Sequence, residues 1–231
     1  MEYRVENKYL VSDAELKLLE ARIKVVMQPD VHQIGECYEI RSMYFDDIVD
    51  SCMNENESGI DLRKKYRVRY YGVTPDVLHL EIKEKTNGYT QKKSCDISEE
   101  ECKQIISGNT VFHIDDRKPW NQLQLQMRGA GMKPKVIIDY ERTAYVHPTG
   151  NVRITFDRNI SASHYCDAFL EECIPGKVPV LPKGRHVLEV KYDELLPDFI
   201  AKQLEIGSLQ KTAFSKYYLG RLAVQGEIPI I

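Results

Sequence analysis

The chain has 231 residues, of which 42% are hydrophobic and 29% charged, values typical of one large or two small folded domains in a water-soluble protein. Its net charge of −3 disfavours a protein that coats DNA, because such proteins are usually basic overall. No apolar run approaches the ~20 residues of a membrane helix, and the N-terminus lacks the apolar core of a signal peptide. We therefore expect a cytoplasmic protein without a membrane segment.

The cysteines give no sign of a disulfide framework or a zinc site. None of the six forms a Cys-x-x-Cys pair, and the histidines show no zinc-ligand spacing. We interpret the thiols as reduced, as expected in the cytoplasm. The six are Cys37, Cys52, Cys95, Cys102, Cys166 and Cys173.

The N-terminal part predicts a strand followed at once by a helix. Residues 3–11 alternate charged with apolar side chains, which is the period of a strand. Ser12 and Glu15 form a capping box that predicts the start of a helix, and Pro29 ends this helix. Beyond it we expect a second strand over 38–46 and a polar connection over 47–60 with room for a short strand.

The stretch 61–96 carries the strongest charge pattern. Two runs in it alternate apolar and charged side chains, which predicts strands with one apolar and one charged face. Asn87-Gly88 predicts a two-residue turn, and counting back from it pairs Lys83 with Lys92. Because opposed like charges repel, we expect an anion to bind there; the alternative is a solvated sheet face. The preceding strand adds Arg67 and Arg69.

The rest of the chain predicts further helices and strands without a linker or repeat. Ser98 and Glu101 form a second capping box, and Gly108 ends the helix that it opens. The expected fold class is α+β, one domain over 1–231 with about eight antiparallel strands and helices outside, and a sheet of this size tends to close. The later elements are a helix over 120–127, strands over 135–146, 151–158 and 185–192, a loop over 174–184, a helix from Pro197 and a terminal helix over 214–225.

Basic residues two apart recur on the predicted strands, with occasional carboxylates between them. If the sheet closes with these faces inward, it forms a basic tunnel, which is tolerable only with an anion or water inside. Guanidinium groups bind phosphate oxygens bidentately, and the carboxylates suit Mg²⁺ or Mn²⁺ bound together with phosphates. Phosphoryl transfer needs this combination. The set is Arg4, Glu6, Lys8, Arg67, Arg69, Glu81, Lys83, Lys92, Arg142, Arg153, Asp157, Glu189 and Lys191.

The ordered motifs resemble a known family over nearly the whole chain. The triphosphate tunnel metalloenzymes, a CYTH-like superfamily, have motifs similar to Glu6-x-Lys8, Arg67-x-Arg69, Glu81-x-Lys83 and Leu188-Glu-Val-Lys191. Within this superfamily the chain resembles the VTC domain, the polyphosphate polymerase domain of the vacuolar transporter chaperone complex and of stand-alone bacterial relatives. The motifs that carry this resemblance are Tyr44-Phe-Asp46, Tyr140-Glu-Arg-Thr-Ala144, Val152-Arg-Ile, Val187-Leu-Glu-Val-Lys191 and Phe214-Ser-Lys216.

The resemblance implies an eight-stranded antiparallel tunnel with helices outside. In it the terminal phosphate of ATP, or of another nucleoside triphosphate, is added to a growing inorganic polyphosphate. Glu189, with help from Glu6, is the implied ligand of Mn²⁺ or Mg²⁺. Arg4 replaces a glutamate of the wider superfamily, which favours a polymerase. The implied phosphate-binding residues are Lys8, Arg67, Arg69, Lys83, Lys92, Arg142, Arg153, Lys191 and Lys216, of which Arg67, Arg69 and Lys83 are catalytic.

Several alternatives remain open. The chain can be a tripolyphosphatase or organic triphosphate hydrolase of the same fold, or a non-catalytic binder of polyphosphate or nucleotide. Binding of single-stranded nucleic acid ranks last, because the charged faces show no clear aromatic pattern, and we expect no nucleic-acid partner. Glu189 can instead form a structural ion pair with Lys191, and Lys216 can be a solvated helix lysine.

Overall fold

The computed structural model describes residues 4–33, 35–60, 62–86, 89–109, 111–207 and 209–227. Its helices are α1 (Asp13–Val26), α2 (Ser51–Glu57), α3 (Glu99–Ser107), α4 (Lys118–Gly129), α5 (Asp198–Leu204) and α6 (Lys216–Val224). Its longer strands are β1 (Val5–Ser12), β3 (Tyr38–Asp46), β4 (Arg63–Tyr71), β5 (Leu78–Thr86), β6 (Tyr89–Ile97), β7 (Lys133–His147), β8 (Val152–Ser163) and β10 (Arg185–Tyr192). Two short strands complete the set, β2 (Gln28–Pro29) and β9 (Val178–Pro179).

The chain divides into two compact units. The first comprises residues 1–39, 140–160 and 181–214, and the second comprises 40–139, 161–180 and 215–231. The strand order is β1-β10-β8-β7 in the first unit and β7-β3-β4-β5-β6 in the second. Strands β3, β7 and β8 pass from one unit into the other. That residues 1–231 act as a single domain stays a prediction.

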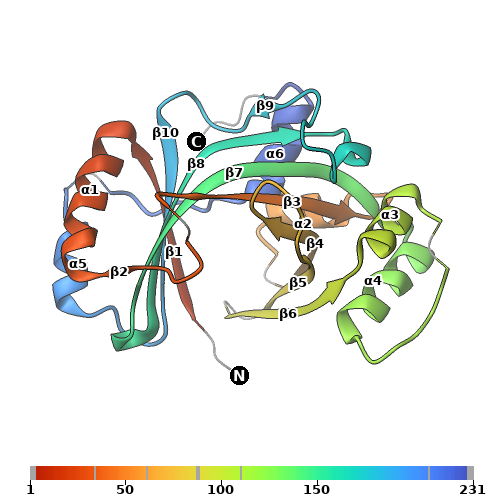
Figure 1. The fold of residues 1–231 in the computed structure, drawn as a ribbon, viewed down its shortest axis with the longest axis horizontal. Coiled ribbons are helices and arrows are strands. Elements are labelled where there is room, and N and C mark those ends of the chain that lie inside the picture. The colour runs from red at the N-terminus through yellow and green to blue at the C-terminus, as the bar shows by residue number, and fades with distance from the viewer. Residues whose placement is uncertain are drawn as a thin grey trace. The chain divides into compact units, whose positions relative to one another are not determined.

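In the first unit, helices α1 and α5 cover one face of the strands (Figure 1). Residues of α1 such as Leu19 and Ile23 pack against Ile154 and Phe156 of β8 and Leu188 of β10. These strand residues alternate with Arg153, Asp157 and Glu189, whose side chains lie on the opposite face. The apolar face of each strand therefore lies under the helices, as the alternation predicts.

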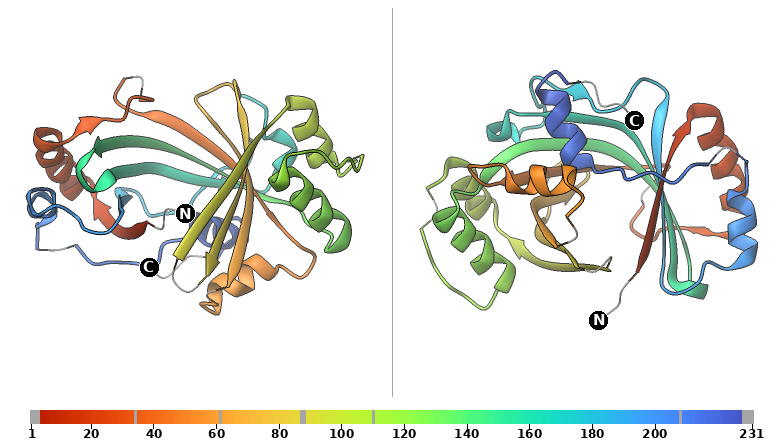
Figure 2. Two further views of the ribbon diagram at one scale, coloured as in Figure 1. Left: turned by 90° about the horizontal axis from the view of Figure 1, so that it is seen from below. Right: turned by 180° about the vertical axis from the view of Figure 1, so that it is seen from behind.

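The second unit repeats this design with different helices. Helix α4 lies against β5 and β6 (Figure 2), and α3 adds side chains to the same buried cluster. Cys102 and Ile105 of α3 and Leu123 of α4 belong to the same buried cluster as Val68 of β4 and Leu80 of β5. Burying these apolar side chains leaves the charged side chains of β4 and β5 on the other face of the sheet.

Both predicted capping boxes are present. Ser12 accepts a hydrogen bond from the backbone N–H of Glu15, and the Glu15 carboxylate accepts one from the backbone N–H of Ser12. Ser98 and Glu101 make the same reciprocal bonds at the start of α3. Gly108 ends α3 with a positive φ of 72°, a conformation that glycine adopts without strain.

The expected short strand within 47–60 is wrong, because this segment contains helix α2. Carboxylates before the helix provide the cap that the sequence interpretation overlooked. Asp46 accepts hydrogen bonds from the backbone N–H groups of Cys52, at 2.9 Å, and Met53, at 3.0 Å. Asp47 accepts one from Ser51 at 2.9 Å. These bonds satisfy N–H groups that the first turn of a helix leaves without partners.

Among the residues that the structure describes, no helix combines the length and the apolar character that crossing a membrane requires.

The buried cluster of the second unit predicts unequal effects for two leucines. Leu80→Ala removes a side chain that is 0% exposed, so we expect unfolding free energy to fall by about 2–5 kcal/mol. Leu125→Ala, at a position 55% exposed, is the matched control and should change it by less than about 0.5 kcal/mol. Urea unfolding of both variants measures the difference, and equal effects would contradict this packing.

Candidate functional site

The strands of the second unit align their charged side chains in rows. Lys83 of β5 lies directly opposite Lys92 of β6, as predicted, and Lys65 of β4 lies on the other side of Lys83. The next row contains Arg67 and the one after it Arg69. The turn at Asn87-Gly88 lies outside the described residues. We call the basic side chains of this face, together with Lys216 of α6, whose charge acts on Tyr44 of β3, the cation cluster; its members are Lys65, Arg67, Arg69, Lys83, Lys92 and Lys216.

Glu81 is the carboxylate at the centre of the cation cluster. One of its oxygens lies 2.5 Å from Arg67 Nη2, and the other accepts a hydrogen bond from Lys92 Nζ at 3.1 Å. Burial raises the pKa of Glu81, but the charges of Arg67, Arg69 and Lys92 lower it by more, so the pKa lies well below its ordinary value. Glu81 is therefore ionised at neutral pH and holds the basic side chains in place.

The pKa of Tyr44 depends on the positive charge of this face. Its hydroxyl accepts a hydrogen bond from Arg67 Nη1 at 3.1 Å. Burial raises the pKa of Tyr44, but the charges of Arg67, Arg69 and Lys216 together lower it to about 8. This direction of shift is expected where positive charge surrounds a buried hydroxyl, and Lys216 is one of the charges that contribute to it.

Lys65 was overlooked as a site residue, although the alternation that identifies Arg67 and Arg69 includes it. Its Nζ donates to Asn56 Oδ1 at 2.7 Å and to Ser215 Oγ at 2.8 Å. Ser215 also caps α6, because its Oγ accepts a hydrogen bond from the backbone N–H of Tyr218. Helices α2 and α6 thus hold the lysine end of the cation cluster in position.

The first unit places predicted metal and phosphate ligands in one group, which we call the carboxylate cluster: Glu6, Lys8, Glu189 and Lys191. On adjacent strands Glu6 pairs with Lys191, and Lys8 pairs with Glu189. Lys191 Nζ lies 2.5 Å from Glu189 and 3.6 Å from Glu6, and Lys8 Nζ lies 2.8 Å from Glu6. The ion pair between Glu189 and Lys191 that the sequence left as an alternative is therefore present.

The carboxylate cluster has donors that fit a divalent cation. A single ammonium group, that of Lys191, contacts both Glu189 and Glu6, so one cation can bridge the two carboxylates. Thr155 lies opposite Glu189 in the sheet, and its buried Oγ1 has no hydrogen-bond partner among the described residues. Mg²⁺ and Mn²⁺ bind such hard oxygens and keep several sites for water or phosphate. No group of three or more histidine, cysteine, aspartate or glutamate side chains suited to a metal occurs in the described ranges.

The two predicted arginines of the first unit are in different environments. Arg142 binds Asp157 through two hydrogen bonds of 2.6 and 2.8 Å. Burial lowers the pKa of Arg142, but the charge and hydrogen bonds of Asp157, together with the charges of Tyr140 and Glu189, raise it by more, so the guanidinium stays charged. Arg153 Nη2 lies 2.9 Å from Asp30 and donates to Tyr38 at 3.2 Å. One carboxylate, that of Asp157, thus holds Arg142 through two hydrogen bonds. The Arg153 side chain, by contrast, is 35% exposed.

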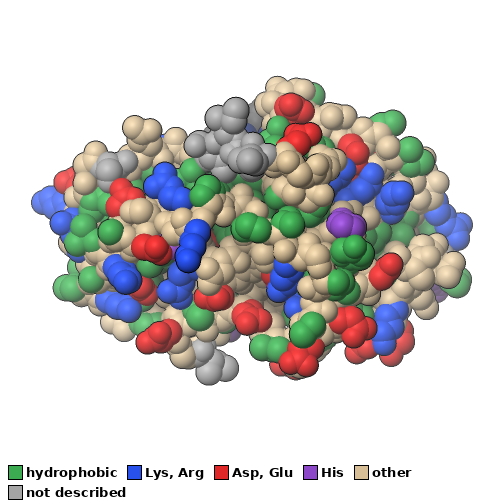
Figure 3. All heavy atoms as spheres, turned by 90° about the horizontal axis from the view of Figure 1, so that it is seen from above, with side chains coloured by type: hydrophobic (Ala, Val, Ile, Leu, Met, Phe, Trp, Pro, Cys, Tyr) green, Lys and Arg blue, Asp and Glu red, His purple; other side chains and the backbone are tan. Residues whose placement is uncertain are grey.

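These clusters are not obvious from the general surface charge. Acidic and basic side chains are interspersed over the face in Figure 3.

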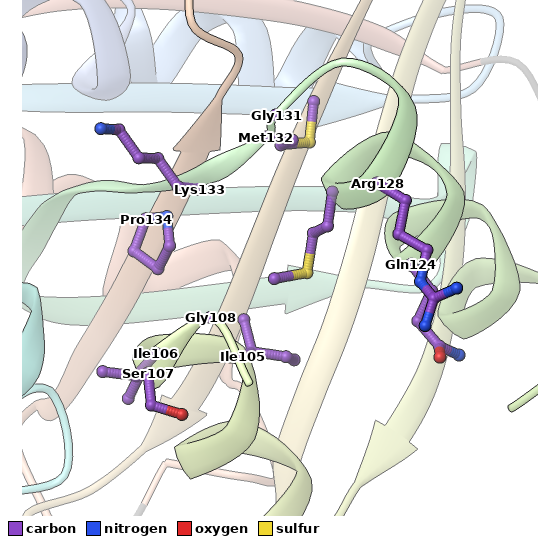
Figure 4. Close-up of a pocket in the computed structure, with 11 residues that line it drawn as sticks. Ile105, Ile106, Ser107, Gly108, Gln124, Arg128, Gly131, Met132, Lys133 and Pro134 are labelled. Carbon is purple, nitrogen blue, oxygen red and sulfur yellow. The ribbon is translucent and has the colours of Figure 1, made fainter. Parts of the chain in front are cut away.

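A cavity of about 340 Å³ in the second unit is lined by the C-terminal ends of α3 and α4 and the start of β7 (Figure 4). Ile105, Met127 and Met132 contribute to its lining, which includes none of the predicted site residues.

Comparison with known proteins gives the family and the fold. The VTC domain family matches residues 3–225. No curated protein shows a significant match. A Bacillus halodurans protein described as a candidate adenylate cyclase is 12% identical, with a TM-score of 0.55 over 93% of this chain and 94% of that one. A Pyrococcus horikoshii protein is 15% identical, with a TM-score of 0.49 over 94% and 97% of the two chains.

The first of these likenesses shows the fold alone, because the identity is low. Together with the eight long strands and the helices of the described chain, it confirms the predicted fold class, α+β with an antiparallel sheet and helices outside. That the sheet closes into a tunnel stays a prediction. The roles of the individual site residues stay predictions.

The environment of Tyr44 predicts an unusual titration. We expect one tyrosine to ionise near pH 8, and we expect Arg67→Ala to raise this pKa because the nearest positive charge is lost. Ultraviolet absorbance of tyrosinate measures the transition, and Tyr44→Phe, which should abolish it, provides the assignment. A transition that persists in Tyr44→Phe would show that it belongs to another tyrosine.

Proposed function

This chain belongs to the VTC domain family, and we propose that it is a metal-dependent enzyme that transfers the terminal phosphate of ATP to a growing inorganic polyphosphate. The observation that carries the proposal is the placement of charge within each unit. Basic side chains occupy the sheet face opposite α3 and α4, and in the first unit the carboxylates Glu6 and Glu189 lie within a group of lysines. Linked phosphates are the ligand whose charge and oxygens match this arrangement.

The cation cluster is proposed to bind and polarise the phosphates. Arg67 and Arg69 are fixed by hydrogen bonds to Glu81 and Ser42, so their guanidinium groups are oriented before the substrate arrives. Lys83 and Lys92 lie side by side despite their like charges, and a bound phosphate would relieve their repulsion. Positioned charges of this kind stabilise the charge that spreads over the transferred phosphoryl group.

The carboxylate cluster is proposed to hold Mn²⁺ or Mg²⁺. Glu189 and Glu6 would be its ligands from this chain, with the Thr155 hydroxyl beside them. The metal, when bound, neutralises phosphate oxygens. Binding of the metal would displace Lys191 and Lys8 from the two carboxylates, and these ammonium groups would then be available to phosphate oxygens.

The proposed reaction needs no covalent intermediate with the protein. A terminal oxygen of the acceptor polyphosphate forms a new bond to the γ-phosphorus of ATP, and the bond from that phosphorus to the bridging β-γ oxygen breaks. The products are a polyphosphate longer by one phosphate and ADP, so atoms and charge balance. The acceptor oxygen is already an anion, so no general base is required, and the side chains act through positioning and charge neutralisation.

Arg4 supports a polymerase over a hydrolase. The wider superfamily often has a glutamate at this place of the first strand, and Arg4 Nε lies 3.0 Å from Asp193 Oδ1. The position therefore supplies a cation and no metal ligand. A hydrolase and a non-catalytic binder of the same fold remain the competing outcomes of the assay below.

The proposal predicts the products formed from ATP and Mn²⁺. We expect the purified protein to make chains that a polyphosphate stain detects on a gel, together with ADP. Arg67→Ala and Lys83→Ala should abolish turnover without unfolding the protein, because each removes a charge that neutralises the phosphates. Lys103→Ala, at a lysine 61% exposed on α3, is the control and should stay active.

Two other results would contradict the polymerase. Orthophosphate without longer chains would identify a hydrolase, and tight triphosphate binding without turnover would identify a binder. Full activity of both Arg67→Ala and Lys83→Ala would show that the cation cluster is not the site.

The metal assignment has its own test. Glu189→Gln keeps the size of the side chain but removes its charge, so we expect Mn²⁺ affinity to fall at least about tenfold. Electron paramagnetic resonance of free Mn²⁺ measures this affinity without turnover. Glu171→Gln, at an exposed glutamate of the second unit, is the control. Unchanged Mn²⁺ binding in Glu189→Gln would exclude Glu189 as a ligand.

A further inference from the structure

The cation cluster ends in exposed aromatic and apolar side chains. Along β4 the side chains that share the charged face are Lys65, Arg67, Arg69 and then Tyr71. Tyr71 is 42% exposed, and Val77, near the start of β5, is 47% exposed. At the end away from Lys65 the charged face therefore changes from cationic to aromatic over one step of the strand, from Arg69 to Tyr71.

Neighbouring side chains hold the Tyr71 ring in place. His79 lies opposite Arg69 in the sheet, and its ring meets that of Tyr71 edge to face, with centroids 5.9 Å apart. Asp96 fixes His79 through a 2.7 Å contact with Nδ1. Arg69 is hydrogen-bonded to the Tyr71 side chain. An exposed ring that two neighbours hold in this way is a preorganised surface on which another flat ring can stack.

The two ends of the cation cluster differ in access. At the lysine end, Asn56 of α2 and Ser215 next to α6 both contact Lys65. At the other end Tyr71 and Val77 are exposed. Lys65 is therefore held by neighbouring side chains, and the exposed end beyond Arg69 can accommodate a bulky group attached to a row of phosphates.

The separation of Tyr71 and Arg67 along β4 is similar to the length of an extended nucleotide. Tyr71 and Arg67 are four residues apart on β4, which is roughly 13 Å at ~3.3 Å per residue. A nucleoside triphosphate has its base at one end and its phosphates at the other, and in extended form it spans such a distance. A base beside Tyr71 would place the phosphates over Arg69 and Arg67.

We infer that Tyr71, supported by His79, forms a stacking subsite for the nucleobase of the nucleoside triphosphate. This inference deepens the proposed function and rests on it. The donor nucleotide then lies along β4 with its base at Tyr71 and its terminal phosphate toward the lysine row of Lys65, Lys83 and Lys92. Inorganic tripolyphosphate has no base, so Tyr71 contributes to binding of the nucleotide only.

The test compares two ligands by titration calorimetry: tripolyphosphate and an ATP analogue with a non-hydrolysable β-γ imido bridge. Tyr71→Ala should weaken binding of the analogue by about 5- to 150-fold, the change expected when one base–aromatic stack is lost. Binding of tripolyphosphate should change by less than about twofold. Tyr71→Phe keeps the ring but loses the hydroxyl that is hydrogen-bonded to Arg69, so it should bind the analogue more tightly than Tyr71→Ala does.

Tyr165→Ala, at another exposed tyrosine of the second unit, is the matched control and should leave both affinities unchanged. An equal loss for both ligands in Tyr71→Ala would overturn the subsite, because Tyr71 would then act only by positioning Arg69. Unchanged binding of the analogue in Tyr71→Ala would also overturn it, while leaving the polymerase intact. Failure of the unmodified protein to bind either ligand would instead reject the proposed function itself.

Discussion

The structure depends on the strict alternation of apolar and charged side chains along its strands. Helices bury the apolar side chains of the strands. Leu19 of α1 and Phe156 of β8 share one buried cluster in the first unit, and Ile105 of α3 and Leu80 of β5 share another in the second. Because successive side chains point to opposite faces, this burial places the charged residues together on the other face. The hydrophobic effect thus assembles groups of like charge that would not associate by themselves.

The same alternation of side chains gives a different balance of charge in each unit. In the cation cluster basic residues outnumber the carboxylates beside them, and the pKa of Tyr44, lowered to about 8, reflects that excess. In the carboxylate cluster Glu6 and Glu189 each lie against a lysine, so charge is nearly balanced. The first arrangement suits bare phosphate oxygens, whereas the second suits phosphates that bring a divalent metal with them. One repeated design thus gives two different charge environments, to which the proposed function assigns two kinds of phosphate binding.

Much of this was predictable from the sequence because the signals are local. The capping box at Ser12 and the pairing of Lys83 with Lys92 follow from spacings of a few residues. Helix α2 was missed because its cap depends on Asp46 and Asp47, which lie before the helix and were assigned to a strand and a loop. Lys65 was missed although the alternation includes it, because its bond to Ser215 depends on a residue far along the chain, and Thr155 was missed because its place beside Glu189 depends on the pairing of two strands. Alternation indicates the face on which a residue lies but not its partners there.

The central claim is that the charged sheet face of the second unit binds linked phosphates. Acetylation of lysines, followed by mass spectrometry with and without tripolyphosphate, tests it most directly. If the claim holds, tripolyphosphate protects Lys83 and Lys92 while Lys103 on α3 is acetylated equally in both conditions. Equal acetylation of Lys83 and Lys92 with and without saturating tripolyphosphate would contradict it.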